Sequence, residues 1–192
     1  MDLAVTDSQS ILEFWFGSPA SDYRKQWFRK DPTLDAQIKT RFMDVYWAMV
    51  ASPPDRWLST AKASLARIVV LDQFARNMFR GTPQSFAADP QALATADLAI
   101  KRGYDTQLLP VERLFLYMPF EHSEHLPHQN RSVAYFESLV LAAPDLDHCL
   151  DYARRHRDVI AKFGRFPHRN EILGRQSTEA ELAFLKQPGS RF

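Results

Sequence analysis

Apolar residues recur at helical spacing along most of the chain, and no stretch alternates apolar and polar residues for long enough to indicate a strand. The clearest helix is predicted over 32–51. Asp31 can cap its first amides, Pro32 suits the first turn, and the apolar positions repeat every three or four residues. Pro53 and Pro54 end it, because proline cannot donate a helical hydrogen bond. The pattern therefore predicts an all-α fold.

Similar patterns and caps predict further helices over 10–16, 57–77, 89–103, 110–120, 128–141 and 146–163, and after the capping box at 178–181. Segment 111–120 is apolar nearly all round, which indicates a position in the core. A total of about eight helices with short connections is typical of antiparallel pairs. No long linker interrupts them, so we expect one domain over residues 1–192.

Charge and composition exclude several classes of protein. The 24 basic and 23 acidic residues give a net charge of +1, whereas a dedicated nucleic-acid binder usually carries a basic excess. The most apolar stretch is interrupted by Arg67, Asp72 and Arg76, so no membrane span is predicted. The N-terminus has no signal-peptide pattern, and the lone Cys149 suits a reducing compartment. We therefore expect a soluble, cytoplasmic protein that binds neither membranes nor nucleic acid.

The first polar cluster follows the most apolar helix, where Glu121, His122, Glu124 and His125 stand together. Imidazole and carboxylate groups bind zinc and similar ions, and His128, His156 or His168 would complete such a site. If the helix continues past Pro119, Glu121 and His125 are one turn apart. The spacing matches no known metal signature, however. The alternative is structural: the carboxylates cap the next segment or pair with arginines.

The second cluster comes from two segments that each contain an Arg-Asn pair. The later one supplies Arg165, His168, Arg169 and Asn170 from a loop after Gly164, and guanidinium groups are well suited to bidentate recognition of carboxylate or phosphate. The earlier segment supplies Asp72, Arg76, Asn77 and Arg80. These residues either bind an anion or brace helix ends through ion pairs. The two segments are not similar enough to demonstrate an internal repeat.

On these residues the chain resembles the bacterial family of unknown function DUF924. The resemblance rests on the segments 11–17 (ILEFWFG), 71–77 (LDQFARN), 80–82 (RGT), 112–124, which includes YMPFEHSE, and 163–170 (FGRFPHRN). It spans nearly the whole chain, although Ala75 stands where the family more often has proline. The resemblance implies a tetratricopeptide-repeat-like arrangement of the helices and implies no activity.

Our leading hypothesis is a binding or adaptor domain whose cleft receives an anionic group of a small molecule or peptide. The alternative is a metal-assisted or acid-base hydrolase that uses the cluster at 121–125. The sequence assigns no catalytic residue, no resident metal and no cofactor. The expected ligand-binding residues are Asp72, Arg76, Asn77, Arg80, Glu121, His122, Glu124, Arg165, His168, Arg169 and Asn170.

Charged groups among so many apolar residues must be paired to tolerate burial. We therefore expect the two Arg-Asn segments and the segment 121–125 to converge in space. We also expect Glu121 or Glu124 to form an ion pair with Arg76, Arg165 or Arg169.

Overall fold

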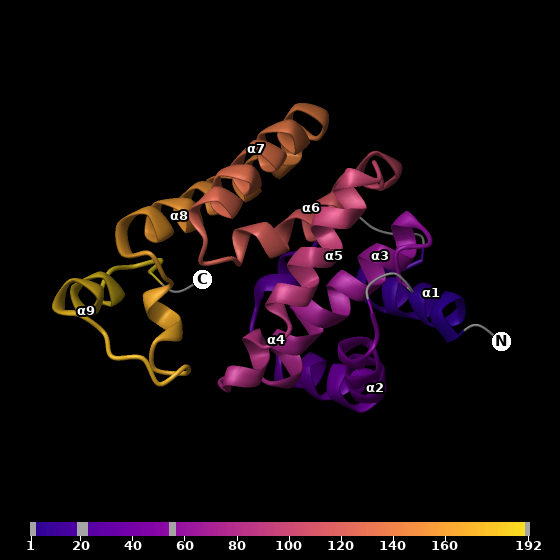
Figure 1. Cartoon of the computed structure of the whole chain (residues 1–192), viewed down its shortest axis with the longest axis horizontal. Helices are drawn as coiled ribbons and strands as arrows, with labels where there is room; N and C mark the ends of the chain where they lie inside the picture. Colours follow the sequence, from indigo (N-terminus) through magenta and orange to yellow (C-terminus); the bar gives the residue numbers. More distant parts are fainter. Residues whose placement is uncertain (1–2, 19–22, 54–56, 191–192) are drawn as a thin grey trace.

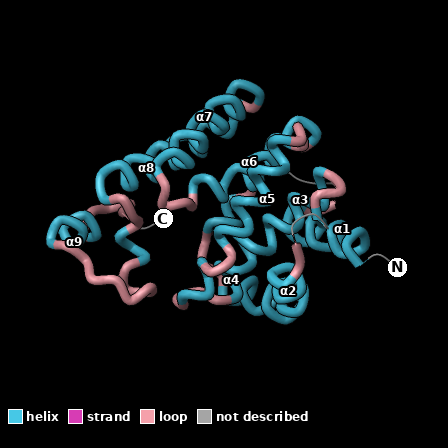
Figure 2. The backbone as a smooth tube through the Cα atoms, in the orientation of Figure 1, coloured by secondary structure: helices cyan, strands magenta, loops and turns pink. Residues whose placement is uncertain are grey.

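The computed structural model describes residues 3–18, 23–53 and 57–190, and within these ranges the secondary structure is entirely helical. Figure 2 shows these helices joined by loops, with no strand in the described backbone. The expected all-α fold is confirmed. None of the described helices is long and apolar enough to cross a bilayer.

Long helices are joined by short helical turns. The α-helices are α1 (Leu3–Phe16), α2 (Pro32–Ala51), α3 (Ala61–Ile68), α4 (Ala75–Met78), α5 (Asp89–Lys101), α6 (Pro110–Glu121), α7 (Leu126–Ala142), α8 (Asp147–Phe163) and α9 (Glu179–Leu185). The shorter elements are η1 (Lys25–Phe28), η3 (Val69–Phe74), η4 (Pro83–Phe86), η5 (Asp105–Gln107), η6 (Pro144–Leu146) and η7 (Pro167–Arg169). Neighbouring helices pack in pairs, as α6 and α7 do, and α7 and α8. The tetratricopeptide-like order stays a prediction.

Figure 1 shows α6 between two groups of helices, with α1 to α5 on one side and α7 to α9 on the other. As predicted, α6 is central: Leu114, Phe115, Leu116 and Phe120 are all fully or almost fully buried. The ring of Phe115 meets those of Trp15 and Trp27 edge-on, with centroids 5.7 and 5.0 Å apart. This aromatic core fixes the segment around η1 against the rest of the fold.

Helix boundaries follow the predicted caps closely in most places. Helix α2 spans the predicted range, and the Asp31 side chain accepts hydrogen bonds from the amides of Thr33 and Leu34. Helix α1 starts earlier than expected, at Leu3, since no proline or glycine precedes position 10. The next helix starts later, at Ala61, because Thr60 is its cap.

The helix predicted over 57–77 contains a wider turn that its sequence did not indicate. Residues Val69–Phe74 form a π-helix, in which the amide of Ala75 donates to the carbonyl oxygen of Val70, five residues back. Such turns are rare and occur frequently at functional sites. This one contains Asp72 and Gln73, and regular α-helix resumes at Ala75.

The Asp31→Ala substitution should lower the free energy of unfolding by about 1 kcal/mol, because it removes the acceptor for two otherwise unpaired amides at the start of α2. Urea unfolding followed by circular dichroism measures this loss. Asp44→Ala, an exposed change in the middle of the same helix, is the matched control. Equal stability of the two variants would contradict a capping role for Asp31.

Candidate functional site

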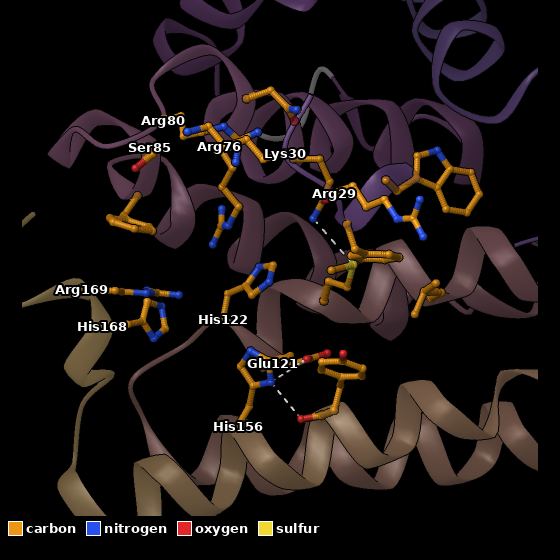
Figure 3. Close-up of a pocket in the computed structure, with 18 of the residues that line it drawn as sticks. Arg29, Lys30, Arg76, Arg80, Ser85, Glu121, His122, His156, His168 and Arg169 are labelled. Carbon is orange, nitrogen blue, oxygen red and sulfur yellow. Dashed lines mark hydrogen bonds and ion pairs between the residues drawn. The ribbon is translucent and has the colours of Figure 1, made fainter. Parts of the chain in front are cut away.

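The two polar clusters meet around one cavity of about 490 Å³, a volume within the usual range for small-molecule sites. Its walls come from the segment 23–30, the π turn with α4, the η4 region, α6, α8 and η7 (Figure 3). Segments from both ends of the chain therefore converge there. The expected binding residues that line the cavity are Arg76, Asn77, Arg80, Glu121, His122, His168 and Arg169.

His122 lies at the C-terminal end of α6, and a carboxylate in the π turn fixes its imidazole. Its Nδ1 is 2.7 Å from Oδ1 of the fully buried Asp72. Burial by itself would raise the pKa of Asp72, but Arg76 and His122 outweigh it and hold that pKa well below its usual range. Burial, followed by Arg76, lowers the pKa of His122, and Asp72 offsets this only in part. At neutral pH, Asp72 is therefore ionised, and a neutral His122 donates its Nδ1 proton to it.

Arg76 is surrounded by acceptors. Its guanidinium forms a bidentate pair with Asp89, at 2.9 and 3.1 Å, and Nη1 donates to the backbone carbonyl oxygen of Asp72 at 2.7 Å. Nη1 also lies 3.2 Å from Oδ1 of Asp72. Because two carboxylates satisfy its charge, Arg76 is a brace between the π turn and the start of α5.

Arg169 is held differently, between two aromatic rings. Its Cζ lies 4.6 Å from the ring centroid of Phe86 and 4.6 Å from that of Phe166. Its side chain is only 8% exposed, and its ion pair with Asp89 is long, at 3.4 Å. The described part of the chain offers its buried Nε no hydrogen-bond partner. Burial and the neighbouring Arg76 accordingly lower the pKa of Arg169 to about 10. Arg169 is thus a cation with little local compensation.

The loop that carries Arg169 is tied down by residues expected to bind a ligand. Glu124 accepts two hydrogen bonds from Arg175, at 2.7 and 2.9 Å, and one from the Phe166 amide. Arg165 forms a bidentate pair with Glu181, and Asn170 donates to that carboxylate and accepts from Arg175. Glu124, Arg165 and Asn170 do not line the cavity, so their contacts give them a bracing role here.

Asn77 and Arg80 line the cavity but share one acidic partner in α2. Asn77 Nδ2 and Arg80 Nη2 each lie 2.8 Å from Oδ1 of Asp35, and Arg80 Nε lies 2.8 Å from Oδ2. These contacts fix the end of α4 to the start of α2. The charge of Arg80 is consequently compensated at the cavity wall.

The segment 121–125 does not form a common site. Helix α6 ends at Glu121, so Glu121 and His125 do not stand one helical turn apart. Glu121 pairs with Nδ1 of His156 at 2.9 Å, whereas His125 is exposed. In the described ranges, no three His, Cys, Asp or Glu side chains are grouped to hold a metal ion. Glu121, His122 and Glu124 instead each have a partner of their own.

The predicted ion pair between Glu121 or Glu124 and one of three arginines is wrong. Arg76 and Arg169 pair with Asp89, and Arg165 pairs with Glu181. The physical reason is proximity. Asp89 and Glu181 lie in the first turns of α5 and α9, beside the arginines. Glu121 and Glu124 pair with His156 and Arg175 instead. Asp72, Glu121 and Glu124 are paired, but the sequence pattern did not identify their partners.

Several residues of the site carried no strong signal. Asp89 was expected only to start a helix, although its carboxylate joins two arginines. Phe86 supplies one of the two aromatic rings that contact the Arg169 guanidinium. Exposed Arg29 and Lys30 line the cavity, and the described residues give their side chains no ion pair. The aromatic content of the sequence indicates that large side chains fill the space between helices, but it does not show which rings face a cavity.

The fold and the site define an all-helical protein with an arginine- and histidine-lined cavity. A family model described as a bacterial protein of unknown function (DUF924) matches residues 11–189, and the chain belongs to that family. A solved structure of a protein of unknown function from Agrobacterium tumefaciens is 40% identical. The similarity covers 93% of this chain and 96% of that one, with a TM-score of 0.82. No curated protein matches the chain.

His168 should make the protein acid-sensitive. Burial, with help from Arg169 and His156, lowers the pKa of His168 from 6.5 to about 3. Below pH 6.5 the unfolded chain therefore binds a proton that the native state does not, and stability falls as the pH decreases towards 3. In His168→Gln, the free energy of unfolding should decline less steeply between about pH 7 and pH 5, where carboxylates are still ionised.

Chemical denaturation at a series of pH values measures both slopes. His122 still titrates in the variant, so its slope should be reduced and not abolished. Asn130→Ala, an exposed change that removes no titratable group, is the control and should leave the wild-type slope unchanged. Identical slopes in wild type and His168→Gln would refute the assignment.

Proposed function

We propose that this protein is a binding domain whose cavity receives the anionic group, a carboxylate or a phosphate, of a small molecule or peptide. The observation that carries the proposal is the state of Arg169. Its buried guanidinium has one long ion pair and an unsatisfied Nε among the described residues, and it belongs to the cavity wall. An incoming anion would add an acceptor at the part of this guanidinium that faces the cavity, and such charge-assisted hydrogen bonds are among the strong ones.

The surroundings of Arg169 favour recognition over bracing. The guanidinium packs against the rings of both Phe86 and Phe166, so little side-chain entropy remains to be lost when an anion binds. Arg29 and Lys30 add positive charge at the exposed part of the wall, where it attracts anions from solution. Arg76, in contrast, forms ion pairs with Asp72 and Asp89, whose carboxylates lie behind the cavity wall.

Substitutions at the two arginines should therefore have opposite effects. Arg76→Ala leaves the carboxylates of Asp72 and Asp89 short of a cation and should lower the free energy of unfolding by on the order of 3–5 kcal/mol. Arg169→Met replaces a poorly paired cation by an apolar chain between two rings, so its stability in ligand-free buffer should equal or exceed that of the wild type.

Melting temperature measured with added phosphate or carboxylate separates the roles of the two arginines. Such an anion should raise the melting temperature of the wild type, because it binds only the native state, and should not raise that of Arg169→Met. A wild type that responds to neither anion, or an Arg169→Met variant that responds as the wild type does, would refute the proposal.

The Asp72–His122 pair favours a second candidate function, acid-base catalysis of hydrolysis. In this version the positioning carboxylate is Asp72 and not a member of the segment 121–125. Because Nδ1 donates to Asp72, the lone pair of a neutral His122 is on Nε2, and the residue lines the cavity. A neutral, oriented imidazole is the form that accepts a proton from water or substrate.

Nitrogen-15 NMR of the imidazole groups tests this candidate. At neutral pH, the His122 spectrum should be that of a neutral ring with the proton on Nδ1. In Asp72→Asn the carboxamide can also donate, so the preference for this tautomer should weaken. A doubly protonated His122 in the wild type would exclude its role as a proton acceptor.

A further inference from the structure

One wall of the cavity is apolar and largely aromatic. It is formed by Tyr23, Trp27, Phe28, Leu114, Met118, Phe136, Tyr152 and Ile172. Phe28 stacks on Tyr23 and on Phe115, with centroids 5.7 and 6.1 Å away, yet 48% of its surface is exposed. Tyr152 is 51% exposed. Large side chains with this exposure, gathered at one cavity, offer contact area to a ligand that has an apolar part.

The aromatic wall is built before any ligand arrives. The indole Nε1 of Trp27 donates to the carbonyl oxygen of Trp15 at 3.0 Å, and its ring packs 5.0 Å from that of Phe115 in α6. Tyr23 in this wall and the adjoining Cys149 are neutral at neutral pH, and burial raises the pKa of both further, to about 12. An apolar group that enters would therefore replace water on a rigid, neutral surface.

The buried part of the polar side has room for a single anionic charge, whereas Arg29 and Lys30 lie at the exposed part of the wall. Arg76 is already satisfied by Asp72 and Asp89, and Arg80 is satisfied by Asp35. Of these three arginines of the cavity wall, Arg169 has the least compensation. A second negative group deeper in the cavity would face Glu121, and Asp72 and Asp89 lie close behind the wall. Because like charges repel, binding of a dianion in this part of the cavity is disfavoured.

These two features together define a class of ligand, and the argument for it rests on the proposed anion-binding function. We infer that the cavity takes an organic monoanion, a carboxylate attached to an alkyl or phenyl group. The carboxylate pairs with Arg169, and the apolar group lies against Trp27, Phe28 and Tyr152. A free inorganic anion would leave most of the 490 Å³ cavity, and its aromatic wall, in contact with water.

Isothermal titration calorimetry of the 192-residue chain with acetate, butyrate, hexanoate and octanoate tests this inference. The charged group is constant in this series, so any gain in affinity reports burial of the chain. Each fully buried methylene should increase the affinity by about fourfold, until the cavity is filled. The dicarboxylate suberate, which has the same number of carbons as octanoate, should bind more weakly than octanoate.

Three variants locate the two ends of the ligand. Arg169→Met should weaken every member of the series. Phe28→Ala should flatten the dependence on chain length while leaving acetate affinity unchanged, and it is expected to fold because the ring is half exposed. Trp47→Ala is the matched control, since Trp47 is 47% exposed and does not belong to the cavity wall.

The outcomes separate this inference from the function on which it rests. Equal affinities for phosphate, acetate and octanoate would overturn the inference and leave anion binding intact. Tighter binding of suberate than of octanoate would also overturn it. Binding of no anion at all would overturn both. N-acetyl-leucyl-leucine distinguishes the source of the carboxylate: tighter binding than octanoate would indicate a peptide C-terminus, and weaker binding a small organic acid.

Discussion

The carboxylate of Asp89 is the contact on which the rest of the site depends. It binds Arg76, in the helix that follows the π turn, and Arg169, in the loop near the C-terminal end. Without it, two guanidinium groups would face each other in a partly buried place. The same carboxylate stands at the first position of α5, where the helix dipole also favours negative charge. Asp89 thus connects the start of α5 to a loop that lies 80 positions further along the chain.

Behind the cavity, charge is arranged in layers. The carboxylates of Asp35, Asp72 and Asp89 lie behind the cavity wall, and the arginines that contact them lie at it. The charges of Arg76 and Arg80 are therefore neutralised from the protein side. The cavity is therefore less cationic than its arginine content suggests.

The sequence predicted the helices well, because caps such as Asp31 and Thr178 act over a few residues. It also indicated that the Arg-Asn segments and the region of His122 belong together. The ion-pair partners were not predictable, since the position of Asp89 beside Arg169 depends on how distant helices pack. The π turn was missed for a different reason. Its residues, Val69–Phe74, have the same apolar pattern that a regular helix would have.

That wide turn is equivalent to one residue inserted into a regular helix. Deleting a residue within Val69–Phe74 would restore α geometry without breaking the helix, but it would turn all that follows by about 100° relative to what precedes it. The contact of Asp72 with His122 and the contact of Arg76 with Asp89 could then not form at the same time. The insertion makes the helix locally less regular. It also allows two consecutive turns to direct Asp72 towards His122 and Arg76 towards Asp89. Its presence or absence in a relative would show whether that protein can build the same site.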